Sequence, residues 1–283
     1  MIRLGLPKGR MQEGVFALLA DAGVRVRAGA RGYRPVVSLP GWEAKILKPQ
    51  SIVEMLHLGS RDVGFAGADW VAELGADLVE VLDLGLDPVE LVAAAPRSLL
   101  AGGRLPARHL VIASEYERLT REWIRSEGLD ATFVRSHGAT EVFPPEDADC
   151  IVDNTATGAT LRDNDLEILA LVMRSSTRLY ASRAAMDDPE RRGAVEHLAL
   201  LLRSVLEARA RVMLEVNVSA ERLEELAAVL PCMREPTIAP LHGDAGFAMK
   251  VAVPRKDLPA LIPLIKSHGG TDIVVSSVAQ IVP

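Results

Sequence analysis

The chain has 283 residues, of which 49% are hydrophobic and 25% charged, and its formal net charge is −6. This length supports two or three domains, and the composition is that of a soluble globular protein. The negative charge argues against a general nucleic-acid binder, and an aromatic content of 4% leaves few stacking platforms for single strands.

The sequence predicts a cytoplasmic protein without a membrane anchor. No apolar run reaches the ~20 residues that a membrane span needs. Lys8, Arg10 and Glu13 interrupt the N-terminal region where a signal peptide would carry its apolar stretch. Cys150 and Cys232 lie far apart without Cys-x-x-Cys spacing, so we expect reduced core thiols and neither a disulfide nor a zinc site.

Strand and helix patterns alternate along the first part of the chain. Strands are expected at Ile2–Leu6, Ala44–Leu47, Val63–Phe65, Val79–Leu82, Val89–Ala94, Leu110–Ala113, Thr132–Val134 and Cys150–Val152. Helices are expected at Gly9–Gly23, Pro49–Leu58 and Tyr116–Ser126. This alternation is typical of parallel α/β sheets.

A long helix, Pro189–Arg211, leads to a distinct C-terminal unit, residues 212–283. Its expected strands are Met213–Val218, Ile238–Leu241, Phe247–Val253 and Ile273–Val282, and its expected helices are Ala220–Leu230 and Leu258–His268. The order β-α-β-β-α-β is the ferredoxin-like pattern. Small domains of this kind often sense amino acids, although the pattern alone does not establish that role.

The segment after the strand Cys150–Val152 carries the strongest functional signal. Asp153 ends the strand, and a turn rich in Thr, Asn and Gly leads to a short helix that begins near Leu161. Backbone N–H groups of a tight turn can hold a phosphate, and the acid can accept hydrogen bonds from ribose hydroxyls. Similar turns also occur without any ligand, and neither a Walker loop nor a Gly-x-Gly-x-x-Gly fingerprint is present.

Four segments of the chain carry a family resemblance. They are Leu4-Gly-Leu-Pro-Lys-Gly-Arg10, Asp62-Val-Gly-Phe-Ala-Gly-Ala-Asp69, Ile151-Val-Asp-Asn-Thr-Ala-Thr-Gly-Ala-Thr-Leu161 and Glu235-Pro-Thr-Ile-Ala-Pro-Leu241. In this order they resemble the long form of the ATP phosphoribosyltransferase family. The third segment resembles its phosphoribosyl-pyrophosphate loop, and the fourth resembles part of its C-terminal regulatory domain. The likeness covers nearly the whole chain.

The resemblance implies an α/β fold with a bilobed catalytic core like type II periplasmic binding proteins. A C-terminal ferredoxin-like (ACT-like) regulatory domain follows. Lobe I would comprise residues 1–90 and 182–211, lobe II residues 91–181, and the regulatory domain residues 212–283. Pro88–Ala95 and Leu169–Ala181 would cross between the lobes. Family members assemble as dimers and hexamers, so a homo-oligomer is expected.

The resemblance also implies a reaction, the committed step of histidine biosynthesis. The phosphoribosyl group of phosphoribosyl pyrophosphate would pass to an adenine nitrogen of ATP, with release of pyrophosphate. Such a displacement needs positioning and electrostatics more than a protein nucleophile. Mg²⁺ is the expected cofactor and would arrive with the substrate, because the sequence contains no all-protein metal cage. The expected partners are ATP, phosphoribosyl pyrophosphate and histidine as feedback inhibitor, without nucleic acid or membrane.

Three residues are assigned to catalysis. Lys8 and Arg10 follow the first strand and could hold pyrophosphate or the ATP phosphates. The helix dipole disfavours cations at a helix start, which favours a functional role over two solvated charges. Glu141 lies in a Gly-x-x-Glu segment like the one before the family's sugar loop. Glu141 could accept hydrogen bonds from ribose hydroxyls or take a proton from the nucleophile, or it could be a solvated acid without a role in the reaction. Arg31 and Lys48 are weaker candidates for the same cleft.

Substrate-binding residues are expected in two of the segments. Asp69 could contact substrate or cap the helix that begins at Trp70. Asp153 is assigned to the ribose hydroxyls. The residues expected to cradle the 5-phosphate are Thr155, Thr157, Gly158, Ala159, Thr160 and Leu161.

In the C-terminal unit, the resemblance assigns histidine contacts to Asn217, Glu235, Thr237 and Asp272. The family favours an acid at the position of Asn217 and a small hydroxyl residue at that of Glu235. An amide binds an α-ammonium group less strongly than a carboxylate does. Glu235 could compensate for this change, or feedback inhibition could be weak.

Two other readings compete with this one. Prephenate dehydratase also joins a bilobed domain to a sensing domain, but its Thr-Arg-Asp triplet is missing, since the nearest string is Ser176-Thr-Arg-Leu179. A bilobed solute-binding protein would carry a signal peptide and would have no need of a sensing domain. A cytoplasmic regulator that binds ligand without turnover remains open.

Overall fold

The computed structural model describes residues 1–27, 32–233 and 235–282. They form two compact units, Met1–Ala20 with Val24–Ala199, and Asp21–Gly23 with Leu200–Pro283, and each is described by itself. Arg31, one of the weaker cleft candidates, lies outside the described residues. Within the described ranges, no helix combines the length and the apolar character that crossing a membrane would require.

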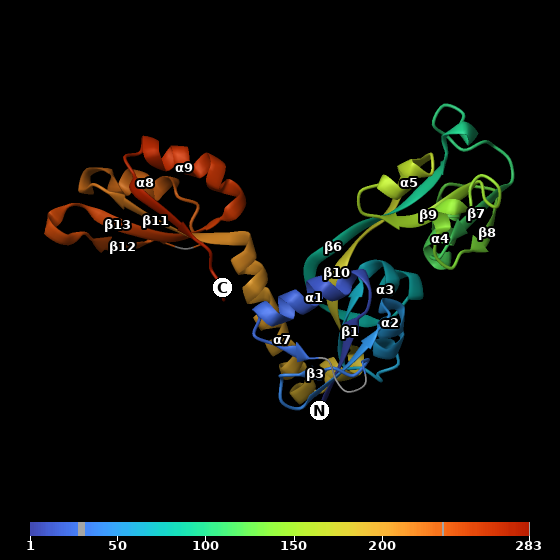
Figure 1. The fold of residues 1–283 in the computed structure, drawn as a ribbon, viewed down its shortest axis with the longest axis horizontal. Helices are drawn as coiled ribbons and strands as arrows, with labels where there is room; N and C mark the ends of the chain where they lie inside the picture. The colour runs from blue at the N-terminus through green and yellow to red at the C-terminus, as the bar shows by residue number, and fades with distance from the viewer. Residues whose placement is uncertain (28–31, 234, 283) are drawn as a thin grey trace. The chain divides into compact units, whose positions relative to one another are not determined.

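The first unit is built on one eight-stranded sheet (Figure 1). Its order is β4-β1-β5-β10-β6-β9-β7-β8. The strands are β1 (Ile2–Pro7), β4 (Trp42–Leu47), β5 (Val63–Gly67), β6 (Leu78–Pro96), β7 (Leu110–Ser114), β8 (Ala131–Arg135), β9 (Cys150–Thr155) and β10 (Leu166–Ser182). A separate pair, β2 (Val26–Arg27) and β3 (Val36–Val37), forms a small antiparallel ribbon.

The sheet has two halves joined by its two longest strands. We call β4, β1 and β5 with their helices lobe I, and β9, β7 and β8 with theirs lobe II. Pairing is parallel within each half, as the sequence predicts. β6 and β10 have 19 and 17 residues, run antiparallel to each other, and extend through both halves (Figure 1). The bilobed α/β class is therefore confirmed.

One prediction for this region is wrong. Val79–Leu82 and Val89–Ala94 are not two strands but parts of the single strand β6. Gly85 (φ 62°) and Asp87 (φ 45°) lie between them, where the register with β10 shifts. These turn-like positions look like a strand break in the sequence, but in the sheet they are absorbed as irregularities of one continuous pair.

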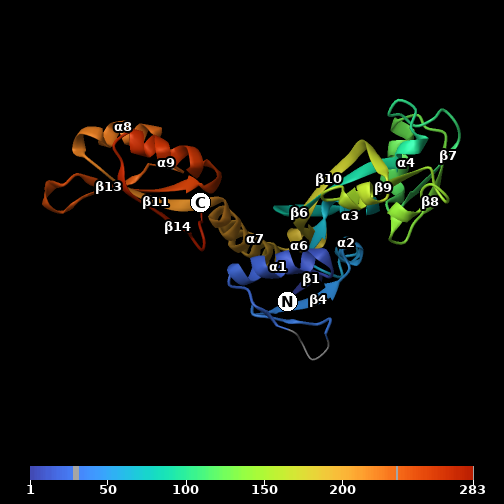
Figure 2. The same ribbon diagram turned by 45° about the horizontal axis from the view of Figure 1, so that its top comes forward.

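Helices cover the faces of both lobes. They are α1 (Arg10–Asp21), α2 (Pro49–His57), α3 (Ala68–Leu74), α4 (Glu117–Ser126), α5 (Ala159–Asp163) and α6 (Arg183–Asp187). The next helix, α7 (Pro189–Ala210), begins in the first unit and ends in the second. In α1, Val15, Leu18 and Leu19 are fully buried, at the spacing that predicts an amphipathic helix. Figure 2 shows α3 beside β6 and β10, between the rest of lobe I and lobe II.

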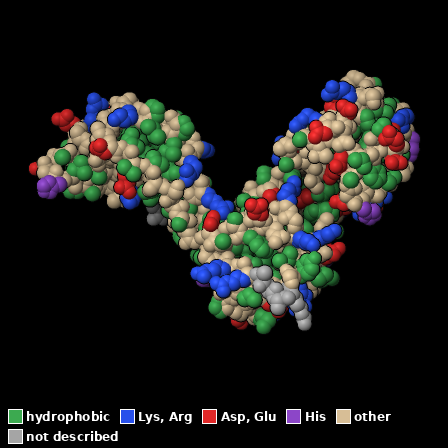
Figure 3. All heavy atoms as spheres, in the orientation of Figure 1, with side chains coloured by type: hydrophobic (Ala, Val, Ile, Leu, Met, Phe, Trp, Pro, Cys, Tyr) green, Lys and Arg blue, Asp and Glu red, His purple; other side chains and the backbone are tan. Residues whose placement is uncertain are grey.

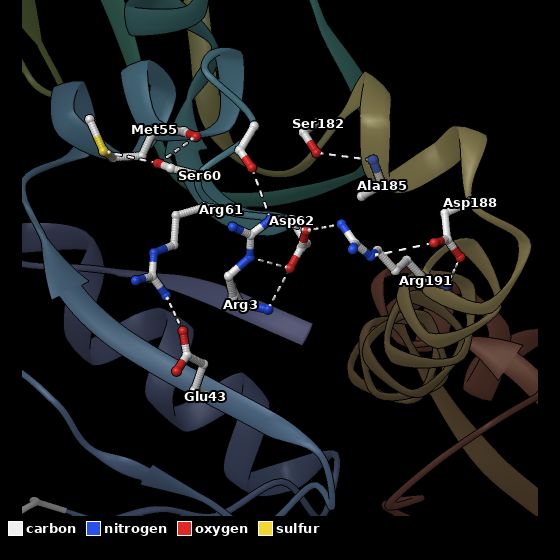
Figure 4. A network of polar contacts seen from close by, with 11 residues as sticks. Arg3, Glu43, Met55, Ser60, Arg61, Asp62, Ser182, Ala185, Asp188 and Arg191 are labelled. Carbon is white, nitrogen blue, oxygen red and sulfur yellow. Dashed lines mark hydrogen bonds and ion pairs between the residues drawn. The ribbon is translucent and has the colours of Figure 1, made fainter. Parts of the chain in front are cut away.

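A buried ion-pair network fastens β1, the start of β5 and α7 (Figure 4). Asp62 is 1% exposed and accepts hydrogen bonds from the Arg3 guanidinium at 2.8 and 3.0 Å and from Arg191 at 3.2 Å. Burial opposes ionisation of this carboxyl, but the hydrogen bonds from Arg3 outweigh burial and lower the pKa of Asp62. Asp62 opens one of the four family-like segments, and its role here is structural.

The second unit has the expected ferredoxin-like order. Its elements are β11 (Arg211–Val218), α8 (Leu223–Val229), β12 (Thr237–Pro240), β13 (Phe247–Pro254), α9 (Leu258–Ser267) and β14 (Thr271–Ser276). The sheet order is β12-β13-β11-β14. Every second residue of β11 is buried against the two helices, where Leu226, Leu261 and Ile265 complete one core.

Two boundaries in this unit differ from prediction by more than two residues. The helix expected at Ala220–Leu230 opens with a 3₁₀ turn, Ala220–Arg222, before α8. The strand expected to reach Val282 ends at Ser276. Ser276 pairs with Met213, and β11 begins only two residues before Met213, so the edge strand runs out of partner there.

Candidate active site

The candidate sugar loop is held by its own threonines. β9 extends to Thr155 rather than ending at Val152, and α5 begins at Ala159, so Leu161 lies inside that helix. Thr155 Oγ1 accepts a hydrogen bond from the Gly158 N–H at 2.8 Å. Gly158 is left-handed (φ 71°), and an added Cβ would lie 2.9 Å from the Arg162 guanidinium. The positive φ therefore favours glycine at this position.

Several N–H groups of this turn are open. Among the described residues, no backbone or side-chain acceptor bonds the N–H groups of Thr157, Thr160 and Leu161. The side chain of Leu161 packs into the lobe II core with Ile151. Open N–H groups in a tight turn and in the first turn of a helix are suited to an anion such as phosphate.

The loop lines one side of a hollow. Arg10 of lobe I and Glu141 and Asp153 of lobe II line the same hollow. The two lobes thus bring together the three charged groups that sequence reasoning selected separately. Glu141 lies in a single 3₁₀ turn, Thr140–Val142, and not at the start of a longer helix.

Asp153 has the most perturbed carboxyl group at this site. Burial raises its pKa to about 6, the N–H of Asn154 opposes the shift from 2.7 Å, and the charges of Glu141 and Glu115 add to it. Hydrogen-bond donors that replace the lost water would stabilise the ionised form of this buried carboxylate. Ribose hydroxyls would be such donors.

A second hollow, of about 470 Å³, adjoins the first and shares Arg10 and Asn154 with it. Lys8, Asp69 and Tyr116 also line it. The side chains of Lys8 and Arg10 are exposed. No carboxylate of the described chain lies within ion-pair distance of either.

A third hollow is strongly basic and shares Lys8 with the second. Arg34, Lys45 and Lys48 line it around Tyr33, and we call these five residues the basic shelf. Lys8 Nζ lies 3.2 Å from the Tyr33 hydroxyl and 5.1 Å from the centre of its ring. In the part of the chain that the structure describes, none of the four cations forms an ion pair.

The predicted capping role of Asp69 is wrong. α3 begins at Ala68 with Gly67 as its N-cap, so Asp69 lies in the first turn. Asp69 is 5% exposed, and its carboxylate accepts hydrogen bonds from Tyr116 Oη and Ser175 Oγ, each at 2.7 Å. Sequence reasoning missed both partners, because nothing local marks a buried tyrosine or a strand serine as the partner of a distant acid.

Three of the four regulatory candidates lie on the sheet of the second unit, and Glu235 precedes it; the four fall in two places. Asn217 Nδ2 donates a hydrogen bond to Asp272 Oδ2 at 3.1 Å. Thr237 lies on β12, two strands away from the β11 strand of Asn217, and the exposed Glu235 precedes it. Across the described residues, no three His, Cys, Asp or Glu side chains form a group that could hold a metal ion.

Acidic and basic side chains are interspersed over lobe II on the face shown in Figure 3, at upper right. That face carries no continuous basic field of the kind that binds a nucleic-acid backbone. The basic residues of the hollows are instead a local set that lines adjoining hollows of lobe I.

Comparisons with known proteins cover both units. The profile of the ATP phosphoribosyltransferase family matches residues 48–204, and that of its C-terminal domain (HisG, C-terminal domain) matches residues 208–280. The ATP phosphoribosyltransferase of Pelotomaculum thermopropionicum is 37% identical over 100% of this chain and 99% of its own length. That of Chlorobium phaeovibrioides is 36% identical over 96% of this chain and 95% of its own.

A solved structure agrees with these sequence matches. The ATP phosphoribosyl transferase (HisG:HisZ) complex from Thermotoga maritima contains a chain that superposes with a TM-score of 0.65 at 26% identity. The match covers 73% of this chain and 99% of that one. The chain therefore belongs to the ATP phosphoribosyltransferase family, a family of pentosyltransferase enzymes.

Proposed function

We propose that this protein joins ATP to phosphoribosyl pyrophosphate, releasing pyrophosphate, as the committed step of histidine biosynthesis in the cytoplasm. The name shared by its relatives points to this reaction. One observation on this chain carries the proposal further: Arg10, Glu141, Asp153 and a turn with open N–H groups line a single hollow. That set offers separate places for a phosphate, a ribose and a leaving anion.

The sugar end of the substrate would bind lobe II. The open N–H groups of Thr157, Thr160 and Leu161 suit the 5-phosphate, with the Thr160 hydroxyl as a further donor. The Asp153 carboxylate would accept hydrogen bonds from the ribose hydroxyls. Gly158 and the hydroxyl of Thr155 shape the turn, so we assign them to loop geometry and not to direct contact. The Ala159 N–H, held by Thr157 at 3.4 Å, belongs to the same scaffold.

The anionic end would face lobe I. Arg10 lines both principal hollows, and Lys8 links the second hollow to the basic shelf. Among the described residues neither cation forms an ion pair, so both are available to neutralise pyrophosphate or the ATP triphosphate. In the reaction, an adenine nitrogen bonds the anomeric carbon while the bond from that carbon to pyrophosphate breaks. Charge that accumulates on the leaving group would be stabilised by Lys8 and Arg10.

Glu141 and Asp153 would stabilise the positive charge that develops on the sugar. Positive charge develops on the sugar ring as pyrophosphate departs, and two carboxylates beside the same hollow favour it. Glu141 would orient the ribose or accept a proton from the nucleophile. Asp69, which has two protein donors, would support the site from behind.

Mg²⁺ is proposed as the cofactor, bound mainly through substrate. The described residues offer no cluster of three acidic or imidazole ligands, although Glu141 and Asp153 could add oxygen ligands beside the hollow. This fits a hard cation that keeps several waters and binds phosphate oxygens. Its contribution would be to neutralise pyrophosphate charge.

Histidine is proposed as a feedback inhibitor that binds the second unit. Asn217 and Asp272 are already within hydrogen-bond distance of each other, which supports them as one half of such a site. Thr237 lies on β12 and Glu235 precedes it, both away from Asn217 on β11. These two residues would therefore form the other half of the histidine site, or would contact histidine that is bound to a neighbouring subunit of an oligomer. We propose a homo-oligomer, dimeric and hexameric, on the family resemblance alone.

The test is an ultraviolet absorbance assay of the purified protein with ATP, phosphoribosyl pyrophosphate, Mg²⁺ and added pyrophosphatase, repeated with histidine. Product formation is expected, and histidine is expected to slow it. If no product forms while either substrate still binds in calorimetry, the protein is a ligand-binding regulator. If neither turnover nor binding is seen, the proposed reaction is wrong for this chain.

The residue assignments need a separate test. Asp153→Ala and Thr160→Ala are expected to weaken the binding of phosphoribosyl pyrophosphate, while ATP binding changes little. Asp163→Ala, on the exposed side of α5, is the matched control. Unchanged affinity in both loop variants would remove the assignment of this loop, even if the enzyme is active.

A further inference from the structure

One phenol oxygen joins three segments that are far apart in the sequence. Tyr116 is fully buried at the start of α4 in lobe II. Its hydroxyl donates to Asp69 Oδ2 of α3 in lobe I at 2.7 Å and accepts from Asn154 Nδ2 at the end of β9 at 2.9 Å. The contact therefore ties lobe I directly to the beginning of the candidate sugar loop.

The carboxylate of Asp69 is fixed on its other side as well. Ser175 of β10 donates from Oγ to Asp69 Oδ1 at 2.7 Å, and the Asp69 N–H donates to the same Oγ at 3.0 Å. The ring of Trp70 stacks on that of Tyr116 with 4.7 Å between centroids and 28° between planes. With the ring packed and the carboxylate held, the hydroxyl has one available geometry.

A second buried carboxylate on α3 reinforces the contact. Glu73 is 8% exposed and accepts from the N–H groups of Arg118 at 3.0 Å and Leu119 at 3.1 Å. These belong to the first turn of α4, whose own N-cap residue, Tyr116, supplies no side-chain cap. Arg118 donates in return to the carbonyl of Ala72. Lobe I thus provides the N-terminal cap of a lobe II helix.

We propose that Asp69, Glu73, Tyr116 and Asn154 form an interlobe clasp that positions the sugar loop against the cations of lobe I. The inference rests on the proposed function. Asn154 is the link, because its N–H donates to Asp153 Oδ1 at 2.7 Å while its side chain is held by Tyr116. The placement of the Asp153 carboxylate is thereby tied to Asp69, and so to the lobe that carries Lys8 and Arg10.

The clasp is built to keep one protonation state. Burial raises the pKa of Tyr116 far above its ordinary value, and the charge of Asp69 raises it further. The phenol therefore remains a donor to Asp69 and an acceptor from Asn154 throughout the working pH range. Tyr116 and Glu73 are positioning residues in this scheme, because they act on the loop through Asn154 and through α4.

A double-mutant cycle tests the link. Tyr116→Phe keeps the stacked ring and removes only the shared hydroxyl, and Asn154→Ala removes the other end of the contact. Asn154→Ala is expected to lower kcat/KM for phosphoribosyl pyrophosphate about tenfold, the loss expected from one buried hydrogen bond. Tyr116→Phe is expected to lower it at least as much, because it also removes the donor to Asp69. The KM for ATP is expected to stay within about threefold. The double variant is expected to be at most about twofold worse than the poorer single variant, because both substitutions remove the same hydrogen bond between Asn154 Nδ2 and Tyr116 Oη.

Tyr180→Phe is the matched control, since Tyr180 is a buried tyrosine of the same unit outside the clasp and is 4% exposed. All assays are run well below the melting temperature of each variant, so that a general loss of stability does not enter. Additive losses in the cycle, or a Tyr116→Phe variant that behaves like Tyr180→Phe, would overturn the clasp.

If Tyr116→Phe does not fold, Glu73→Gln carries the test. It keeps the side-chain size and one of the two acceptors for α4, so a several-fold loss in kcat/KM for phosphoribosyl pyrophosphate is expected with an unchanged circular dichroism spectrum. An unchanged kcat/KM would overturn the proposal. A wild-type protein without activity would instead refute the proposed function, and the clasp as a positioning device would fall with it.

Discussion

At the scale of single residues, ionised Asp153 lowers the stability of the fold, and the same carboxylate is proposed to bind the ribose. Its pKa is raised to about 6, so the native state binds this proton more tightly than the unfolded chain does. The free energy of unfolding therefore falls as pH rises from about 4 to 6, and the loss is complete above that window. A shift of two pKa units corresponds to a cost on the order of 3 kcal/mol.

Asp153→Asn is expected to remove that cost. The variant should be more stable than the wild type at about pH 8, by roughly 1–3 kcal/mol, and this gain should shrink toward about pH 4. Binding of phosphoribosyl pyrophosphate should weaken at the same time. Urea unfolding at several pH values and calorimetry check the two effects, with Asp163→Asn as control. A variant that is less stable at pH 8 would contradict the pKa shift.

Gly158 gives a second prediction at this scale. Because its φ is 71°, alanine there would be strained by about 1 kcal/mol, and its Cβ would press on Arg162. Gly158→Ala should raise the KM for phosphoribosyl pyrophosphate and lower the melting temperature. Gly193→Ala, inside α7 with open space around the Cβ, should instead be neutral or stabilising by up to ~1 kcal/mol. Equal effects would mean that the loop tolerates a side chain.

The residue scale also marks the limit of sequence reasoning about this site. Arg10, Glu141 and Asp153 could be selected because each follows a strand or precedes the sugar loop, and they do line one hollow. Tyr116, Ser175 and Glu73 could not. Their significance arises from contacts with residues 38 to 106 positions away, which leave no local pattern.

At the scale of elements, the periodicity of apolar residues predicted those helices and strands that bury one face. α1 and β11 follow their apolar spacing because one face of each is buried. The long strand β6 could not be predicted as one element, since Gly85 and Asp87 resemble a turn and only pairing with β10 keeps them in the sheet. The end of β14 depends in the same way on the length of its partner.

The network around Asp62 gives the prediction at this scale. Asp62→Asn leaves Arg3 and Arg191 without their carboxylate, and it should cost roughly 2–3 kcal/mol of unfolding free energy near neutral pH. The pKa of Asp62 is lowered, so its stabilisation is present above its unfolded pKa, near 4, and is lost as pH falls through the folded value.

Urea unfolding of wild type and Asp62→Asn between about pH 3 and 6 checks this window. The difference in free energy should be constant above about pH 5 and should shrink below about pH 4. Asp147→Asn, at an exposed acid of lobe II, should show no such dependence. A difference that grows on acidification would mean that the carboxyl is not stabilised by its arginines.

At the scale of the whole molecule, the proposed feedback links the two units, because histidine bound to one would slow the reaction in the other. Turnover would occur in the first unit and histidine would bind the second, so inhibition requires a free-energy coupling between the two sites. The sequence could predict both units, because each has its own core and its own periodicity. It could not predict how Asn217 would be used, since Asn217 is paired with Asp272 across β11 and β14.

Asn217→Asp tests this coupling. The new carboxylate would face Asp272, so the unliganded second unit should lose stability through like-charge repulsion. A bound α-ammonium group would relieve that repulsion and form a charge-assisted bond, so histidine should bind about tenfold more tightly. Histidine should then raise the melting temperature of Asn217→Asp more than that of the wild type, and inhibition should shift to lower concentration.

Asn217→Ala separates this effect from a general loosening of the sheet. It also removes the hydrogen bond to Asp272, but it offers no acceptor to an ammonium group. Its histidine affinity should therefore be equal to or lower than that of the wild type. If Asn217→Asp and Asn217→Ala respond to histidine alike, the ligand does not contact this position. Tighter binding without stronger inhibition would mean that the second unit senses histidine but is not coupled to turnover.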